Sequence, residues 1–204
     1  LRYAPELAPH LAGTDNPAIG ELRWISGVSC KTWERYGIHL LEPIARVLGP
    51  GFVSVRLETF SEGTAFPSSA GLAKEERRDE AGLDLNRGIN PLLQPGTAPS
   101  TVEVAHLTHR SGVQVSLPVI SDGGATFGTM HLCGVAGQTT IRFSDTYAAF
   151  RGQLVSFIDT VRTGARPYPF AETVELMSVL IAGIRSRAEG SRRVAVAEIL
   201  SELS

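Results

Sequence analysis

Residues 31–49 read KTWERYGIHLLEPIARVLG, and the rest of the chain is organised around this stretch. Its apolar residues recur at the spacing of one helix face, and the stripe consists of Leu41, Ile44, Ala45 and Leu48. The run Gly49, Pro50 and Gly51 then ends the helix. Pro43 has no backbone N–H, and proline is tolerated only in the first helical turn or at a kink. The pattern predicts an amphipathic helix with His39 at or near its start.

His39 is the main candidate for a functional residue. An imidazole gains and loses its proton close to neutral pH, so it suits proton transfer. The alternative is a histidine that only caps the helix or lies half-buried with its hydrogen bonds satisfied. The polar and aromatic residues that precede it favour the functional interpretation; they are Lys31, Glu34, Arg35 and Tyr36.

Composition limits the possible class of protein. With 204 residues, 43% of them hydrophobic, we expect one domain with a substantial core. A net charge of -2 and a pI near 6.2 predict small-molecule or protein partners, with no nucleic acid and no membrane. The lone Cys30 and Cys133 indicate neither a disulfide framework nor a zinc site, which favours a cytoplasmic protein. The sequence starts at Leu1 without a methionine, so we expect a segment upstream of it.

Alternating patterns predict strands on both sides of the helix, at residues 20–28 and 52–58. The residues expected to share a face are Leu22, Trp24 and Val28 in the first strand, and Val53, Val55 and Leu57 in the second. Residues 101–121 form two further alternating runs around Arg110–Gly112, which predicts a hairpin. Its second strand places Val113, Val115, Leu117 and Val119 on one face. Pro118 favours an edge strand or a bulge there.

The remaining segments complete an α+β pattern. Residues 61–100 are interpreted as an insertion, which is either a lid, a binding loop or a disordered segment, or else a solvated excursion with a short charged helix at 73–81. Residues 126–143 predict two more strands, joined around 135–138, which makes about six strands in all. A short helix at 4–12 is interrupted by Pro9, and the closing RRVAVAEI is compatible with a last strand.

Two helices are predicted between the last strand pair and the end of the chain, each burying one apolar face. Asp145 or Ser144 caps the first, which ends at Gly164; its stripe is Tyr147, Phe150, Leu154, Phe157, Ile158 and Val161. The second ends near Gly190 and carries Val174, Met177, Leu180, Ile181 and Ile184. The sequence therefore predicts an open, mostly antiparallel sheet of about six or more strands with helices packed on one face. Subunit pairing or another domain would cover the other face.

Four segments carry a resemblance to a known family: LRYAPEL at 1–7, AIGEL at 18–22, GIHLLEPIARVLG at 37–49, and AAFRGQLVSFIDTVRTGARPYPFAETVELMSVLIAGIRSRAEG at 148–190. Together they resemble the C-terminal domain of the Gfo/Idh/MocA oxidoreductases, the relatives of glucose-fructose oxidoreductase and inositol dehydrogenase. The last segment is the most specific. The insertion at 61–100 has no counterpart in the family.

The resemblance implies half of a two-domain, NAD(P)-dependent oxidoreductase acting on a sugar, polyol or related hydroxy or keto compound. Residues 1–204 would be its substrate-binding and oligomerisation domain, with a Rossmann domain upstream and a homo-oligomer formed through the open sheet face. The chain has no GxGxxG fingerprint after a strand, and the glycine pair of SDGGA lies in a hairpin turn. The family's Glu-Lys-Pro motif is absent as well. NAD or NADP would therefore be bound mainly by residues outside this chain.

The resemblance also assigns roles to residues. His39 would be the general acid/base, with Tyr36 and Lys31 as further catalytic residues. Trp33, Glu34, Arg35 and Arg2 are expected to contact the substrate. The family usually has an aspartate four positions before the histidine, where this chain has Arg35. Glu34 could replace that acid, or Tyr36 and Lys31 could take over proton transfer.

Other interpretations of these motifs remain open. Ser29 or Cys30 could be a nucleophile with His39 as its base, although no nucleophile elbow is evident. His106 and His109 are three apart on a strand, which puts their rings on opposite faces, and with His131 they are more typical of core or surface positions than of a metal site. The basic RSRAEGSRR suits a helix C-terminus better than a nucleic-acid patch. A non-catalytic sensing or assembly domain is the main alternative, favoured by Arg35 and by the missing nucleotide half.

Overall fold

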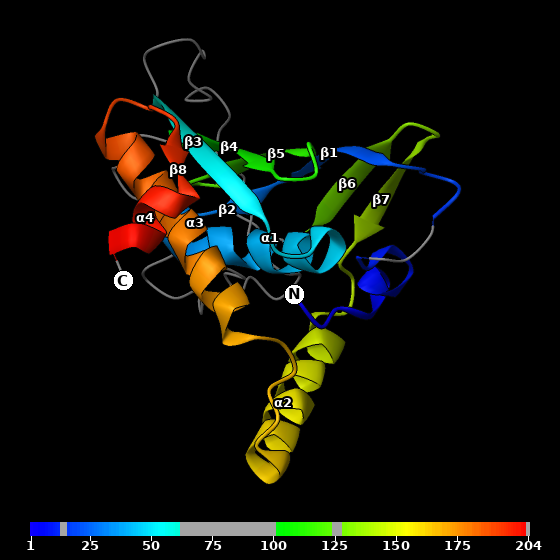
Figure 1. Ribbon diagram of the computed structural model, residues 1–204. Coiled ribbons are helices and arrows are strands. Elements are labelled where there is room, and N and C mark those ends of the chain that lie inside the picture. Colours follow the sequence, from blue (N-terminus) through cyan, green and yellow to red (C-terminus); the bar gives the residue numbers. More distant parts are fainter. Residues whose placement is uncertain (13–15, 62–100, 124–127, 203–204) are drawn as a thin grey trace, which may run out of the picture.

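The computed structural model describes residues 1–12, 16–61, 101–123 and 128–202 (Figure 1). The expected insertion, with its charged helix at 73–81, lies outside the described residues apart from Ser61. The strands are β1 Leu22–Gly27, β2 Ser29–Cys30, β3 Phe52–Ser61, β4 Thr101–His109, β5 Gln114–Ile120, β6 Thr129–Gly134, β7 Gln138–Arg142 and β8 Val194–Ala195. The helices are the 3-10 helix η1 Pro5–His10, then α1 Trp33–Leu48, α2 Thr146–Thr163, α3 Phe170–Ala188 and α4 Val196–Glu202.

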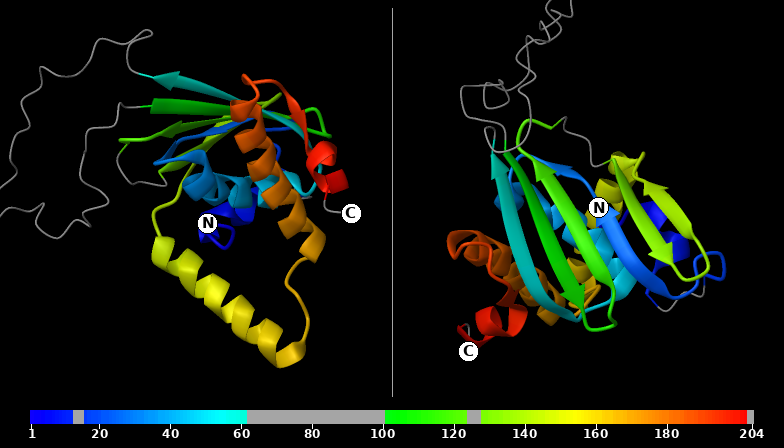
Figure 2. Two further views of the ribbon diagram at one scale, coloured as in Figure 1. Left: turned by 90° about the vertical axis from the view of Figure 1, so that its left-hand side faces the viewer. Right: turned by 90° about the horizontal axis from the view of Figure 1, so that it is seen from above.

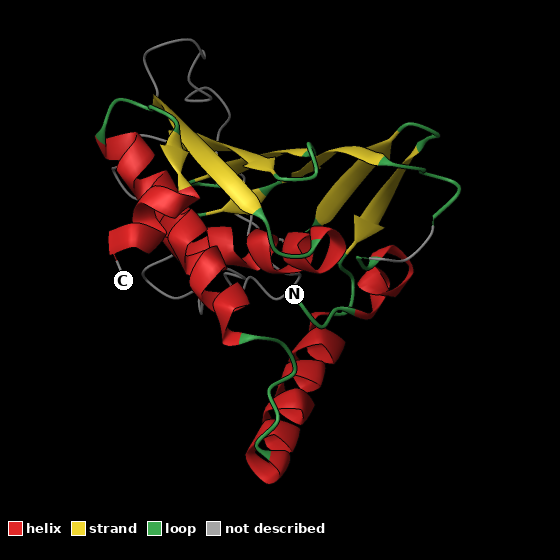
Figure 3. Ribbon diagram, viewed as in Figure 1, coloured by secondary structure: helices red, strands yellow, loops and turns green. Residues whose placement is uncertain are grey.

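The eight strands of the described residues belong to one open sheet with the order β7-β6-β1-β5-β4-β3-β8, and β2 pairs with β5. Strands β1 and β2 run parallel to β5, while the other pairs are antiparallel. Helices α1 and α3 pack on one face of this sheet, and the opposite face is not covered by any described element (Figures 2 and 3). The expected α+β class, with a mostly antiparallel sheet and helices on one face, is confirmed.

Helix α1 begins earlier than the sequence predicted. Trp33 is its first residue, so His39 lies well inside the helix and not near its start, and the helix continues through Pro43. A proline inside a helix removes one backbone hydrogen bond. Burial of Leu40, Leu41 and Ile44 against the sheet offsets that cost, because tertiary packing of the apolar face supplies most of the stability of a helix in a protein.

Two strand faces differ from their predicted orientation. Val55 and Leu57 of β3 are buried as expected, but Val53 is 47% exposed because the pairing with β4 shifts register between Phe52 and Ser54. A similar shift in β1 leaves Trp24 exposed and turns the neighbouring Ile25 into the core. An irregularity of this kind reverses which side chains face inward, since alternate residues of a strand point to opposite faces.

The predicted β4–β5 hairpin is confirmed, and Val113, Val115, Leu117 and Val119 are all buried. The prediction of an edge strand from Pro118 is wrong, because β5 lies between β4 and β1 in the middle of the sheet. β1 and β2 have the same register against β5, and this register places Val28 opposite Pro118. Val28 lies in the break between β1 and β2, so proline is tolerated at this position of β5. On the side of β1 and β2, the ladder is therefore interrupted opposite the proline.

The prediction that both C-terminal helices bury one face is wrong for α2. Asp145 caps the helix by accepting a hydrogen bond from the Ala148 N–H at 2.7 Å, and Gly164 ends it with φ of 72°, both as expected. However, α2 projects away from the sheet (Figure 1), and among its described residues only Ala149 is buried. Its predicted stripe is exposed at every position: Tyr147, Phe150, Leu154, Phe157, Ile158 and Val161.

Helix α3 packs on β3 and α1, but with a different face from the one predicted. Leu180 is buried as expected, whereas Met177 and Ile181 are exposed. The buried residues of α3 are Leu176, Ser178, Val179, Leu180, Ala182, Gly183 and Ser186. The predicted last strand is reduced to β8, and α4 follows it directly. None of the helices in the described residues is both long enough and apolar enough to cross a bilayer.

Candidate functional site

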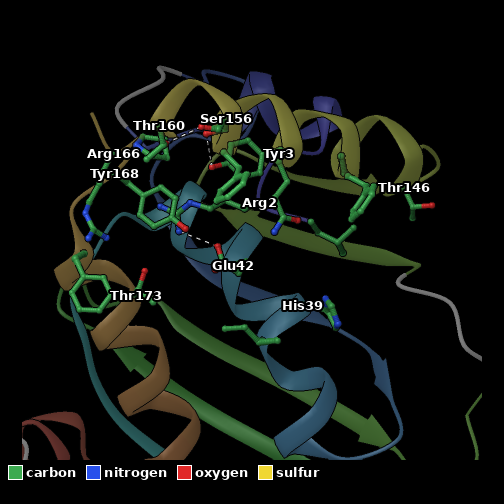
Figure 4. Close-up of a pocket in the computed structure, with 18 residues that line it drawn as sticks. Arg2, Tyr3, His39, Glu42, Thr146, Ser156, Thr160, Arg166, Tyr168 and Thr173 are labelled. Atoms are coloured by element: carbon green, nitrogen blue, oxygen red, sulfur yellow. Dashed lines mark hydrogen bonds and ion pairs between the residues drawn. The ribbon is translucent and has the colours of Figure 1, made fainter. Parts of the chain in front are cut away.

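A cavity of about 680 Å³ lies between the N-terminal segment, α1, α2 and the loop that connects α2 to α3 (Figure 4). This size is within the range of small-molecule sites. His39 and Glu42 reach it from α1, and Arg2 and Tyr3 reach it from the N-terminal segment. Three regions that are distant in the sequence, 1–3, 38–42 and 146–173, therefore contribute to one cavity.

His39 is half-buried in the wall of this cavity. Burial lowers the pKa of its imidazole, and the nearby Glu42 carboxylate raises it by a smaller amount. The ring of Tyr36 packs against the imidazole, with ring centroids 5.4 Å apart and a tilt of 57°. The neutral imidazole is thus favoured near pH 7, and this form can accept a proton from a hydroxyl group.

Arg2 forms the most buried charged cluster of the cavity. Its guanidinium donates to Glu42 Oε2 at 3.0 Å and to the Glu172 carboxylate, and only 6% of its side chain is exposed. The guanidinium carbon also lies 3.6 Å from the centroid of the Tyr168 ring, a cation–π contact. Arg2 thereby joins α1, α3 and the loop before α3, and it fixes the position of Glu42 one turn beyond His39 (Figure 4).

Hydroxyl groups and aromatic rings make up much of the remaining wall. Tyr3 and Ser156 hydrogen-bond to each other at 3.1 Å between their oxygens. Other hydroxyl-bearing residues of the wall are Thr146, Thr160, Tyr168 and Thr173, with the amide of Gln153 beside them. Phe150 and Phe157 of α2 add apolar surface. Such a lining offers hydrogen bonds to hydroxyl groups and apolar contact to the carbon skeleton that bears them.

The structure brings together only some of the residues predicted from the sequence. His39 and Arg2 line the cavity, and Tyr36 contacts the His39 ring without lining it. Lys31 lies at the junction of β2 and α1 with φ of 69°, and its backbone N–H donates to the Ile120 carbonyl. The catalytic roles expected of these residues remain predictions.

Trp33, Glu34 and Arg35 lie outside the cavity wall. The indole N–H of Trp33 donates to the Leu180 carbonyl at 3.0 Å, and the ring is fully buried in the core. Glu34 pairs with Arg187, which also donates to Glu103 at 2.5 Å. Arg35 is on the exposed side of α1. These contacts anchor the first turn of α1, and roles in substrate binding remain predictions for all three residues.

Two residues of the site were missed in the sequence. Glu42 is three positions after His39, and the i,i+3 spacing could have placed both on one helix face. Tyr168 could not have been found this way, because its contact with Arg2 joins residues 166 positions apart.

The nucleophile interpretation receives no support from the surroundings of Ser29 and Cys30. Both residues are buried, with 3% and 2% exposed, and neither lines the cavity. The Ser29 hydroxyl donates to the Tyr36 carbonyl at a long 3.5 Å. An attacking group needs access to its substrate, which neither side chain has in this conformation.

The histidines of the sheet lie as the strand argument predicted. His106 is exposed while His109 is buried, so their rings lie on opposite faces of β4. His131 hydrogen-bonds to Thr140 on the neighbouring strand. Within the described part of the chain, no group of three or more His, Cys, Asp or Glu side chains could hold a metal ion.

Two arginines of the basic segment 185–193, at the end of α3 and just beyond it, are paired with carboxylates. Arg185 pairs with Glu198 and Glu202, and Arg192 pairs with Glu189 and Glu198. These ion pairs attach α4 to the end of α3, so the charges do not form a free basic patch.

Comparisons with known proteins support the fold. No protein-family model and no curated protein matches the sequence. Among solved structures, a myo-inositol dehydrogenase from Corynebacterium glutamicum is 16% identical with a TM-score of 0.60 over 95% of this chain and 62% of its own. One from Lactobacillus casei, in complex with NAD(H) and myo-inositol, is 15% identical with a TM-score of 0.61 over 95% and 59%. GenD2 from gentamicin A biosynthesis, in complex with NAD, is 17% identical with a TM-score of 0.62 over 95% and 61%.

These similarities establish a shared fold across nearly the whole of this chain. The chain spans about three fifths of the length of each of these solved structures.

Proposed function

We propose that this chain is the substrate-binding half of an NAD(P)-dependent oxidoreductase of the Gfo/Idh/MocA type that acts on a sugar, polyol or related hydroxy or keto compound. The observation that carries the proposal is the position of His39 in the wall of a hydroxyl-rich cavity, beside the Arg2–Glu42 ion pair. The shared fold supports it, since the solved structures that resemble this chain include a myo-inositol dehydrogenase in complex with NAD(H) and GenD2 in complex with NAD.

The nucleotide-binding half is proposed to lie outside this chain. Dinucleotides bind with their pyrophosphate at a helix N-terminus. In the described residues, the first turn of α1 instead receives the Glu103 carboxylate, at 3.2 Å from the Trp33 N–H. The start of α2 receives Asp145 and the carboxylate of Glu6, which accepts from the Ser144 N–H at 2.9 Å. Carboxylates therefore occupy the first turns of α1 and α2, where a pyrophosphate would otherwise bind, and this supports a nucleotide-binding half outside this chain.

Proton transfer is the part of the reaction that we assign to this chain. A nicotinamide held by the other half would exchange hydride with the carbon that bears the substrate hydroxyl. Neutral His39 accepts the hydroxyl proton during oxidation and returns it during reduction. Arg2 keeps the Glu42 carboxylate paired, which limits the negative charge next to the imidazole. The hydroxyl and amide groups of the wall orient the other hydroxyls of the substrate.

The uncovered face of the sheet is proposed as the surface through which the protein forms a homo-oligomer. Several large apolar side chains on it are between 41% and 47% exposed: Trp24, Val28, Val53 and Phe60. Exposed apolar groups on a broad sheet face favour association with another copy.

The test is turnover by the complete gene product with NAD(H) and NADP(H) on a panel of sugars, cyclitols and hydroxy acids. His39→Gln should lower kcat by at least about 100-fold, the usual contribution of general acid–base catalysis. His131→Gln, which removes a histidine from the solvent-facing side of the sheet, is the matched control. Equal turnover of the two variants would reject the role of His39.

A non-catalytic sensing or assembly domain of the same family is the second candidate. Arg35 favours it, because this residue stands where the family usually has an acid. This candidate predicts that sugars or cyclitols bind the cavity, as measured by calorimetry, without any change in NAD(H) fluorescence. Cofactor binding together with turnover would exclude it.

A further inference from the structure

Arg166 gives the wall of the His39 cavity a positive charge that no other described side chain neutralises. Three side chains of this wall are charged near neutral pH: Arg2, Glu42 and Arg166. Arg2 and Glu42 form an ion pair with each other. Arg166 takes part in none of the ion pairs between described residues. The wall therefore carries one positive side-chain charge that a ligand can neutralise.

The other arginine of the wall has its donors in use. The Arg2 guanidinium donates to the carboxylates of Glu42 and Glu172, and the Tyr168 ring lies against it at 3.6 Å from its central carbon. A negatively charged group placed beside Arg2 would be repelled by both carboxylates. An anionic group of a ligand is therefore directed to Arg166 and not to Arg2.

The loop between α2 and α3 holds Arg166 in place. The residues that follow it are Pro167, Tyr168 and Pro169. A proline fixes its own φ and restricts the residue before it, so the backbone at Arg166 has little freedom. The guanidinium carbon of Arg166 lies 5.1 Å from the centroid of the Phe170 ring, a cation–π contact. The charge is thus positioned before a ligand binds, although the side chain is exposed to solvent.

Arg166 and His39 lie on opposite sides of the Arg2–Glu42 pair (Figure 4). A substrate whose reacting hydroxyl is beside His39 therefore reaches Arg166 with its far end. A guanidinium binds a carboxylate through two parallel hydrogen bonds. A carboxylate also brings one negative charge, which matches the single unneutralised charge of the wall, whereas a phosphate monoester brings nearly two.

We infer that the substrate of the His39 cavity is a polyhydroxy acid, with its carboxylate bound by Arg166 at the end remote from the hydroxyl that is oxidised. This inference rests on the function proposed above and narrows its substrate class from sugars and polyols in general to sugar acids. Arg166 determines specificity in this scheme, and proton transfer remains with His39.

The experiment compares matched substrates of the complete gene product with NAD(H) and NADP(H). The substrates are hexoses, the corresponding hexuronates, and the hexuronamides, which have the shape of the acid without its charge. Values of kcat/KM are measured at low ionic strength, because salt screens exposed ion pairs. We expect kcat/KM for a hexuronate to exceed that for its hexuronamide by about fivefold, the upper end for a solvent-exposed ion pair.

Three variants test whether Arg166 causes this preference. Arg166→Gln should abolish it, and Arg166→Lys should retain part of it, since lysine keeps the charge without the planar fork. Arg162→Gln is the matched control and should keep the preference in full, because Arg162 is also exposed but does not line the cavity. Thermal unfolding of each variant checks that it is folded.

The other outcomes separate this inference from the proposed function. Turnover of the sugars without a preference for the acid, or an equal loss of preference in Arg166→Gln and Arg162→Gln, would reject the carboxylate site and leave the function standing. A higher kcat/KM for hexose phosphates than for hexuronates would assign Arg166 to a phosphate and overturn the inference.

If none of these compounds is turned over, the proposed oxidoreductase is rejected, and calorimetry with the hexuronates decides the inference. Binding that is weakened by Arg166→Gln but not by Arg162→Gln supports the carboxylate site. The absence of binding, or equal binding by the two variants, overturns it.

Discussion

Gly183 of α3 lies directly against the indole ring of Trp33, so closely that a Cβ at position 183 would overlap the ring. Trp33, the first residue of α1, is thus inserted into the surface of α3, where its indole N–H donates to the Leu180 carbonyl. Gly37 faces the same ring from α1 itself, with a Cβ contact of 2.8 Å. This contact between the two helices sets the distance between them and therefore the position of His39.

Gly183→Ala should destabilise the protein by about 1–3 kcal/mol, because overpacking a filled core outweighs the better helix propensity of alanine. Urea unfolding measures the change. In a Trp33→Leu background the smaller side chain leaves space for the added methyl group, so Gly183→Ala should cost less there. Equal costs in the two backgrounds would show that Trp33 is not the residue that requires the glycine.

Arg2→Ala should destabilise the protein by about 2–4 kcal/mol, because it leaves two partly buried carboxylates without their partner. Those carboxylates belong to Glu42 and Glu172, which are 24% and 21% exposed. Arg23→Ala is the control: its ion pair with Glu21 is 57% and 65% exposed and should contribute less than about 1 kcal/mol. Similar losses in both variants, measured by chemical denaturation, would contradict the assigned importance of the Arg2 cluster.

Lys31→Gly should be neutral or stabilise the protein by up to about 1 kcal/mol, because Lys31 has a left-handed backbone conformation that glycine adopts without strain. Lys31→Val should destabilise it, since a β-branched side chain is strongly disfavoured at positive φ. The glycine variant also tests catalysis without loss of folding. If it folds and keeps full turnover, Lys31 has no part in proton transfer.

His39 should make stability depend on pH. Burial lowers the pKa of His39 in the folded state, so the unfolded chain takes up the proton more readily. The contribution of neutral His39 to the free energy of unfolding is therefore fully present above about pH 6.5. It falls as the pH decreases from there towards the lowered pKa of His39 in the folded state. His39→Gln should reduce this loss between pH 7 and 5, as measured by thermal unfolding.

The effect of His39→Gln will be partial, because burial also lowers the pKa of His10 and of His109. His131→Gln is the control on the solvent-facing side of the sheet. An unchanged pH dependence in His39→Gln would contradict the burial of the imidazole.

The sequence predicted the fold well where pattern and packing agree. The β4–β5 hairpin has strict alternation and a short turn, and each of its four predicted core residues is buried. The start of α1 could not be predicted, because the signal from Pro43 is local while the burial of Trp33 depends on α3. For the same reason, the stripe of α2 predicted burial that the described residues do not provide, since a local pattern does not show which element, if any, lies opposite it.

The candidate site was predicted only in part. His39 was found because histidine beside a polar segment is chemically distinctive, and Arg2 because of its place in the N-terminal motif. Trp33 and Glu34 were grouped with them by closeness in sequence, but successive helix residues point in different directions. The wall formed by Tyr168 and by α2 depends on long-range contacts that no local pattern encodes.

The parallel pairing of β1 with β5 determines when this domain can fold. Trp24 of β1 pairs with Gln114 of β5, so the strand and its partner are separated by 90 residues of chain. At the usual rate of translation, β1 emerges from the ribosome roughly 5–20 s before β5 does. During that interval β1 has neither of its sheet neighbours, since β6 is synthesised later still. We therefore expect the nascent chain to depend on chaperones at this stage and to refold slowly in vitro, as domains with distant strand pairings do.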